Sequence, residues 1–106
     1  MPDIFKALAD TTRRDILLRV AERPTSVNEL VDGFSMSRPA ISKHLKLLAA
    51  AGLVSYQPGT EDGRQRICHA EIRALTELDD YLSKVRTFWN QRLDRLGDFL
   101  EEQDQR

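Results

Sequence analysis

The stretch that most constrains this chain runs from residue 35 to residue 54, SMSRPAISKHLKLLAAAGLV. Its apolar side chains recur at helical spacing on one face, and a second face is basic and able to hydrogen-bond. The apolar face consists of Ile41, Leu45, Leu48 and Ala49. The basic face consists of Arg38, Ser42, Lys43 and Lys46. The stretch therefore predicts a short helix with one buried side and one exposed side.

Both ends of this helix are marked in the sequence. Ser37 can accept a hydrogen bond from the first amides, and Pro39 falls in the first turn, where a missing N–H costs nothing. Gly52 suits the left-handed residue that ends a helix. A short helix with a basic face fits a major groove, which is edged by phosphates and base acceptors. We interpret this stretch as a DNA recognition helix.

Three further helices are expected before it. Helical spacing predicts the first over residues 3–9, and Asp10 is placed to cap a second over residues 11–22. The inward residues of the second helix are Ile16, Leu17, Val20 and Ala21. Ser26 and Glu29 form a capping box for a third helix, which Gly33 helps to end. That helix buries Leu30, Val31 and Phe34. Two short helices joined by a tight turn make a helix-turn-helix.

After Gly52 the pattern changes to two strand-length runs, residues 53–57 and 64–70, with a turn at 58–63 that holds a proline and two glycines. This predicts a β-hairpin. Arg64 and Arg66 lie beside its tip, so we interpret the hairpin as the wing of a winged helix, reaching for a minor groove or for phosphates.

Residues 71–102 predict one long amphipathic helix, because only Gly97 interrupts them and apolar residues recur by threes and fours. Its stripe comprises Leu75, Leu78, Leu82, Val85, Trp89, Leu93, Leu96 and Leu100, with Phe88 and Phe99 beside it. A small winged-helix body cannot cover a stripe of this length. A second copy of the chain is the simplest partner.

Composition sets the remaining bounds. The 106 residues are expected to form a single domain, 1–106, and the net charge of −1 argues against a polycation that coats nucleic acid. Residues 35–66 nevertheless carry a charge of +3. With one cysteine, Cys68, and no apolar run long enough for a membrane span, the chain is expected in a reducing cytoplasm and not in a membrane.

The chain resembles the ArsR family of winged-helix bacterial repressors over nearly its whole length. The resemblance rests on ALADTTRRDIL at residues 7–17, SRPAISKHLKLLAAAGLV at 37–54 and GRQRICHAEI at 63–72. Thr11 stands where the family usually has proline. The resemblance implies a mainly α fold with a small β-hairpin, in the order α-α-α-α-β-β-α. It also implies a homodimer that binds a partly palindromic operator on double-stranded DNA and blocks transcription.

Two residue sets follow from these observations. The expected DNA-binding set is Ser37, Arg38, Pro39, Ser42, Lys43, His44, Lys46, Arg64 and Arg66. Arg38 is the first choice for reading bases, and Lys46 for a phosphate. By resemblance the dimer forms through the first and last helices. The expected interface residues are Ile4, Phe5, Leu8, Leu78, Leu82, Val85, Phe88, Trp89, Leu93 and Leu96.

The sequence departs from the metal-sensing members of that family. Their cysteines in the third helix are replaced by residues 27–31, VNELV, and the last helix has no histidine. The nitrogen and sulfur ligands are limited to His44, His69 and Cys68, so we expect no metal and no cofactor. Residues 81–100 instead resemble the metal-free branch. Whether a small molecule or a protein acts as effector stays open.

Several alternatives accompany this interpretation. His44 belongs to an SKHL motif and suits a structural or phosphate-contacting role. His69 is interpreted as structural, and Cys68 either as an inert apolar residue or as a thiol sensor. A second function is a module that docks a partner protein. An enzyme is not expected, because the chain lacks a glycine-rich phosphate loop, a metal-ligand set and a nucleophile with a base.

Overall fold

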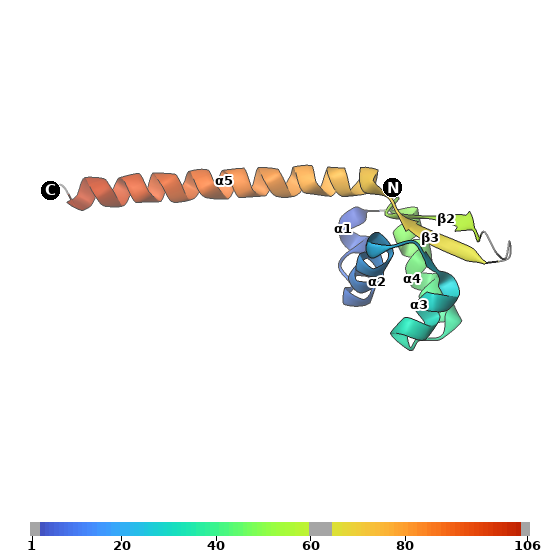
Figure 1. Cartoon of the computed structure of the whole chain (residues 1–106). Coiled ribbons are helices and arrows are strands. Elements are labelled where there is room, and N and C mark those ends of the chain that lie inside the picture. Colours follow the sequence, from blue (N-terminus) through green and yellow to red (C-terminus); the bar gives the residue numbers. More distant parts are fainter. Residues whose placement is uncertain (1–2, 60–64, 105–106) are drawn as a thin grey trace. The chain divides into compact units, whose positions relative to one another are not determined.

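The computed structural model describes residues 3–59 and 65–104, with side chains described up to residue 103. It separates the chain into two units, Met1–Leu75 and Thr76–Arg106. The helices are α1 (Ile4–Ala7), α2 (Thr11–Glu22), α3 (Val27–Phe34), α4 (Arg38–Ala50) and α5 (Ile72–Asp104), and the strands are β1 (Thr25–Ser26), β2 (Val54–Pro58) and β3 (Arg66–Ala70). All of them except β1 are labelled in Figure 1. The fold is mainly helical with a small antiparallel sheet, as predicted.

The sheet has three strands where the sequence predicted two. Its order is β1-β3-β2, so β3 lies in the centre and pairs on both edges. Thr25 pairs with Cys68, which in turn pairs with Tyr56 on β2. Strand β1 escaped prediction because two polar residues carry no apolar alternation. Thr25 is nonetheless buried, and its hydroxyl donates to the carbonyl of Arg23 at 2.8 Å.

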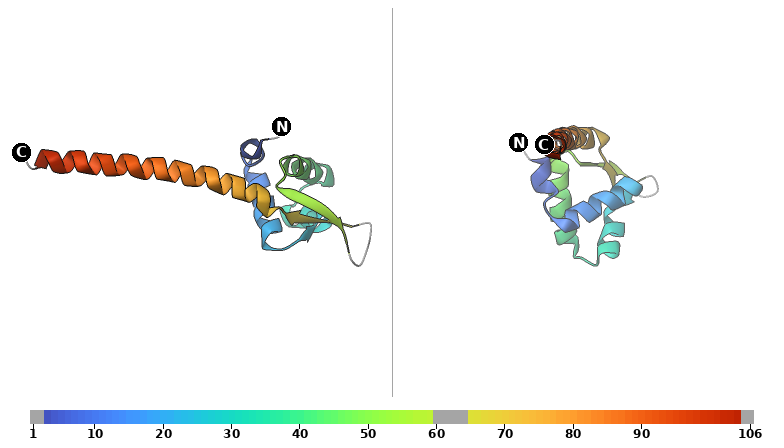
Figure 2. Two further views of the ribbon diagram at one scale, coloured as in Figure 1. Left: turned by 90° about the horizontal axis from the view of Figure 1, so that it is seen from above. Right: turned by 90° about the vertical axis from the view of Figure 1, so that its left-hand side faces the viewer.

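The helices of the first unit enclose one apolar core, and Figure 2 shows α3 and α4 beside the sheet from two further directions. Its largest fully buried residues are Ile16, Val20, Thr25, Leu30, Ile41, Leu45, Leu48, Leu53 and Cys68. Helix α4 contributes three of these, Ile41, Leu45 and Leu48, so the face predicted to be buried is buried. Ala49 lies at the edge of the core, only partly covered.

Three local predictions need correction. Helix α1 ends at Ala7, not at residue 9, because Asp10 is extended and caps α2 by accepting from the N–H of Arg13 at 3.2 Å. Ala21 is exposed and does not face inward. Helix α3 runs past Gly33 to Phe34, and Ser35 takes the left-handed conformation with φ 51°. Leu30 is buried as predicted, and Val31 and Phe34, also predicted to be buried, are partly buried and pack against the core.

Other local features agree with prediction. Ser26 caps α3 by accepting from the N–H of Glu29 at 3.1 Å, which is one half of the predicted capping box. Ser37 caps α4, Pro39 lies in its first turn, and Gly52 has the left-handed φ of 76°. Helix α5 is one continuous helix of 33 residues.

Candidate nucleic-acid interface

Helix α4 presents the predicted basic face to solvent. Its buried face anchors it in the core, and this fixes which side chains point outward. Arg38, Lys43 and Lys46 are exposed, and Ser42 is half-buried between them. Ser37 and Pro39 at the start of the helix are exposed as well. Arg38, Lys43 and Lys46, which the sequence assigned to DNA, are therefore accessible on α4.

Arg38 is held by a residue that the sequence did not single out. Its Nη2 donates a hydrogen bond to the amide Oδ1 of Asn28, near the start of α3. The contact spans the turn of the helix-turn-helix, where Ser35 reverses the chain. No periodicity in the sequence could reveal it, because it depends on the crossing of α3 and α4.

Arg66, the first residue of β3 after the hairpin turn, is also held by a neighbour. Its guanidinium carbon lies 4.7 Å from the centre of the Tyr56 ring on β2, a cation–π distance. Partial burial raises the pKa of the Tyr56 hydroxyl, so the ring is neutral at ordinary pH. Tyr56 pairs with Cys68, two residues from Arg66, so a known hairpin register would have revealed this diagonal contact. Arg64, the other predicted wing residue, lies outside the described residues.

The two arginines meet at a surface pocket between α3, α4 and β3, which we call the α3–α4–β3 pocket. It has a volume of about 280 Å³. Its described lining residues are Ser26, Val27, Asn28, Arg38, Ser42, Gln65 and Arg66. None of them is acidic, and two carry a positive charge. The arrangement can accept an anion or the acceptor edge of a base.

His44 sits between the two faces of α4, half-buried. Its Nδ1 lies 3.5 Å from Nη1 of Arg13 on α2. Because a guanidinium only donates, Nδ1 accepts in this contact and the ring proton is assigned to Nε2. Nε2 is then the atom for any phosphate contact.

Arg13 fastens α1 to α2 through several contacts. Its Nε donates to the carbonyl of Ala7 at 2.6 Å and its Nη2 to that of Lys6 at 3.3 Å. Asp10 accepts from the Arg13 N–H and faces its guanidinium at 3.9 Å, which lowers the pKa of that carboxyl. These contacts give Arg13 a structural role beside the recognition helix.

Cys68 lies in the core, fully buried on the central strand. Burial raises the pKa of its thiol to about 11, so it is protonated at neutral pH and its nucleophilic form is scarce. His69, the next residue, is half-buried. Within residues 3–59 and 65–104, no three His, Cys, Asp or Glu side chains come together in a way that could hold a metal ion.

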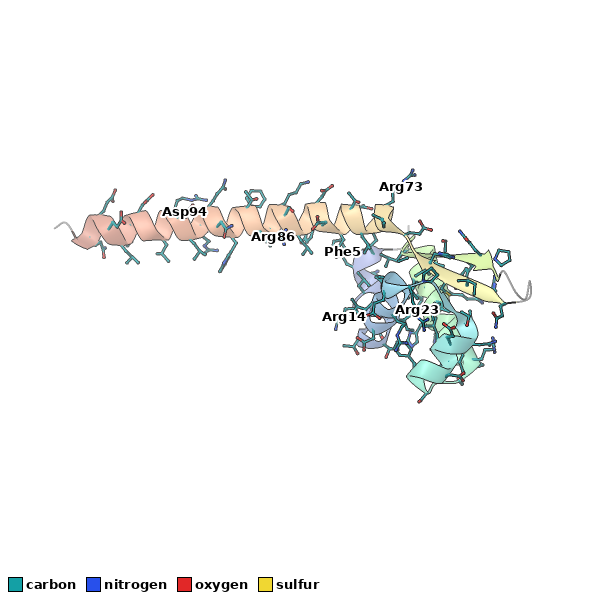
Figure 3. The ribbon with its side chains drawn as sticks, in the orientation of Figure 1. Phe5, Arg14, Arg23, Arg73, Arg86 and Asp94 are labelled. Carbon is teal, nitrogen blue, oxygen red and sulfur yellow. The ribbon has the colours of Figure 1, made fainter. Side chains whose placement is uncertain are left out.

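The apolar stripe of α5 is largely exposed. Figure 3 shows side chains along this helix as sticks, with Arg73, Arg86 and Asp94 labelled. The exposed predicted interface residues on α5 are Leu82, Val85, Phe88, Trp89, Leu93 and Leu96, and Leu78 is half-covered. Phe5 on α1 is exposed, whereas Ile4 on α1 and Leu8, which follows that helix, pack against the core of their own chain. In the part of the chain that is described, α5 and the other helices are too polar or too short to cross a membrane.

Comparison with known proteins connects this geometry to a family. The family described as bacterial regulatory protein, arsR family, matches residues 10–56, which hold the whole helix-turn-helix. The HTH-type transcriptional regulator Rv2034 of Mycobacterium tuberculosis is 39% identical over 98 residues, covering 89% of each chain.

Two further relatives agree. The HTH-type transcriptional repressor SmtB of M. tuberculosis is 40% identical over 63 residues, covering 59% of this chain and 44% of the repressor. A solved ArsR-like transcriptional regulator from Rhodococcus sp. RHA1 superimposes with a TM-score of 0.77 at 31% identity, covering 93% of this chain and 88% of the other. The chain therefore belongs to the ArsR family and is a winged helix-turn-helix, DNA-binding transcriptional regulator, not an enzyme.

Proposed function

We propose that this regulator is a homodimeric repressor that binds an inverted-repeat operator and needs no metal inducer. The observation that carries the proposal is the α3–α4–β3 pocket, where Arg38 of the recognition helix and Arg66 of the wing meet on a surface with no acidic lining residue among those described. A module built only to dock a protein has no need of two such arginines beside an exposed basic helix face.

Within this proposal the roles divide along α4. Arg38, at the start of the helix, reads a guanine edge, since a guanidinium can donate two parallel hydrogen bonds to it. Lys43 and Lys46 contact phosphates, together with the hydroxyls of Ser37 and Ser42. Pro39 and His44 shape and flank this surface. Arg66, and Arg64 beyond the described strand, extend it along the wing.

The dimer is proposed from α5. A continuous exposed stripe that includes Leu82, at 43% exposed, and Trp89, at 58%, is costly to leave in water. We infer that residues 71–102 pair with a second copy and that α1 contributes through Phe5, with Ile4 and Leu8 behind it. Residues 1–106 then act as one winged-helix domain per subunit. Two copies related by a twofold axis read two half-sites about 34 Å apart.

Metal-independent control is proposed from the ligands that are present. Cys68 is buried, His69 is its neighbour on the strand, and the Nδ1 edge of His44 faces Arg13. None of the three is arranged to share a soft metal ion with the others. The bacterial chromosome lies in the cytoplasm, so the repressor is proposed to act there, released by an effector that is a small molecule or a protein, or governed by its own expression level.

The deciding experiment selects bound fragments from a genomic or random DNA pool and then measures fluorescence anisotropy on the winning sequence and a scrambled control across a salt series. We expect an inverted repeat bound about 10³-fold or more tightly than the control. Affinity should fall steeply with salt because phosphate contacts release counterions. Equally weak binding to both duplexes would favour the protein-docking module. Promoter transcription with and without the protein then separates repression from activation.

The proposal that no metal acts as inducer is tested by measuring whether added metals release the operator. Adding Zn²⁺, Ni²⁺, Cd²⁺ or arsenite, one at a time, is expected to leave the affinity unchanged, and so is prior treatment with a chelator. A metal that releases the DNA at stoichiometric concentration would contradict it.

A further inference from the structure

The two arginines of the α3–α4–β3 pocket share an unusual feature, which is that each is restrained by an uncharged neighbour. Asn28 accepts a hydrogen bond from Arg38, and the ring of Tyr56 lies under Arg66. Among the described residues neither guanidinium lies within salt-bridge distance of a carboxylate. Arg13 on α2, by contrast, is paired with Asp10.

Restraint without neutralisation has a physical consequence. An arginine paired with a carboxylate loses much of its attraction for a phosphate or a guanine edge, whereas one held by an amide or a ring keeps its full charge. A free arginine side chain must also give up rotamer entropy on binding. A side chain that is already oriented has less to lose.

The donors left over are sufficient for recognition. A guanidinium has five N–H donors, and Asn28 takes one of those of Arg38. A bidentate contact with guanine needs two more. The ring of Tyr56 occupies one face of the Arg66 guanidinium and leaves the N–H groups at its edge to bond in the plane.

We propose that Asn28 and Tyr56 are positioning residues that hold Arg38 and Arg66 over the α3–α4–β3 pocket with their positive charge available to DNA. The proposal rests on the proposed function, because it assigns these arginines to the operator. It extends the DNA-recognition machinery from α4 and the wing to the start of α3 and to strand β2, whose residues Asn28 and Tyr56 act by orienting the two arginines.

The first test is Asn28→Ala in the full chain, measured on the selected operator and on operators with single base changes. Discrimination at the base read by Arg38 should fall about 2- to 10-fold, the range that one hydrogen bond supplies. In an Arg38→Ala background the same change should have no further effect, because the residue it positions is gone. Gln91→Ala, which removes an exposed amide from the polar face of α5, is the matched control and should bind as the unmodified chain does. Unchanged discrimination, or a loss that persists without Arg38, overturns the assignment of Asn28.

A second variant, Asn28→Asp, separates positioning from charge. The carboxylate still accepts from Arg38 but neutralises it. Affinity for all sequences should fall, and the slope of log affinity against log salt should become shallower by about one contact. Asn28→Ala should leave that slope near its original value. An Asn28→Asp variant with unaltered affinity and slope would show that the charge of Arg38 is not used.

Tyr56 is tested by a conservative pair. Tyr56→Phe keeps the ring under Arg66 and should bind normally, whereas Tyr56→Leu removes it and should weaken operator binding about 2- to 5-fold. Because Tyr56 also packs against the core, both variants are first compared by urea unfolding. A weaker binding of Tyr56→Leu that is retained in an Arg66→Ala background would assign the loss to the core and contradict the proposed role.

The DNA-free protein provides an independent readout. The line width of the side-chain N–H resonance of Arg38 should differ between Asn28→Ala and the unmodified chain, because the guanidinium gains mobility when its acceptor is removed. If the unmodified chain binds specifically and the Asn28→Ala and Tyr56→Leu variants bind DNA just as it does, this inference alone is overturned. No specific binding by the unmodified chain overturns the repressor proposal and this inference together.

Discussion

Helices α4 and α5 carry the same kind of apolar pattern, but the apolar face of α4 is buried and that of α5 is exposed. On α4, Leu45 is 1% exposed and Leu48 is fully buried, whereas on α5 Trp89 is 58% and Leu93 48% exposed. The difference lies in the elements that face the apolar side, because α4 packs against α1, α2, α3 and β2 of its own chain. Residue spacing predicts that a helix has an apolar face, but only the rest of the assembly decides what covers it.

The largest expected effect comes from disrupting the proposed contact between α5 and a second copy of the chain. Trp89→Glu places a charge in the centre of the stripe, so we expect monomers by sedimentation. Operator affinity should fall about 10²- to 10⁴-fold, since each half-site is then bound independently. Gln91→Glu adds the same charge on the polar face of the helix and should leave the dimer intact. A dimer that survives Trp89→Glu would place the contact elsewhere.

The next effect concerns the buried face of α4. Leu45→Ala should lower the free energy of unfolding by about 2–5 kcal/mol, because it leaves a cavity in the core. Leu47, also on α4, is 44% exposed, and Leu47→Ala should cost well under half as much. Urea unfolding followed by circular dichroism measures both. Equal losses would mean that α4 is not seated as described.

The exposed face of α4 gives a smaller and more selective effect. Arg38→Ala should relax base preference at one operator position by about 1–3 kcal/mol. Lys46→Ala should weaken binding to all sequences alike and flatten the salt dependence. Anisotropy titrations on operator and scrambled duplexes at three salt concentrations distinguish the two patterns. If neither substitution alters binding, the recognition face has been misassigned.

The smallest effect comes from Cys68 in the core. Its folded pKa of about 11 lies above that of an unfolded thiol, so the unfolded state releases its proton first as pH rises. Stability should therefore be unaffected below pH 8 and fall by about 1 kcal/mol between pH 8 and 10. Cys68→Ala should lose that component, which paired urea titrations measure. Rapid alkylation of the native thiol at pH 7 would argue instead for an exposed, reactive cysteine.

Much of this fold was predictable because its signals are local. Asp10, Ser26 and Ser37 mark helix starts through side chains that cap nearby amides, and Gly52 marks an end through its left-handed backbone. Such signals depend on a few neighbouring residues. Gly33 misled because the presence of glycine does not require a helix to stop, and Ser35 adopted the left-handed conformation instead.

Of the candidate site, only the exposed residues of α4 could be predicted, and the residues that contact its arginines could not. The exposed residues of α4 follow from its buried ones, since the two faces of a helix are linked by geometry. The partners Asn28 and Tyr56 do not follow in that way, because they come from other elements that meet α4 and β3 only after folding. Strand β1 was missed for the same reason: its burial is decided by β3, far along the chain.

The central position of β3 also governs the order in which the parts of the protein can fold. Thr25 finds its strand partner at Cys68 only after α3, α4 and β2 have been synthesised. Closing so long a segment carries an entropy cost that local helix contacts do not. A nascent chain can thus form α1 to α4 on the ribosome while the sheet is still incomplete. The α3–α4–β3 pocket is therefore completed late in translation, when β3 emerges and adds Arg66 to the lining that already includes Arg38 of α4.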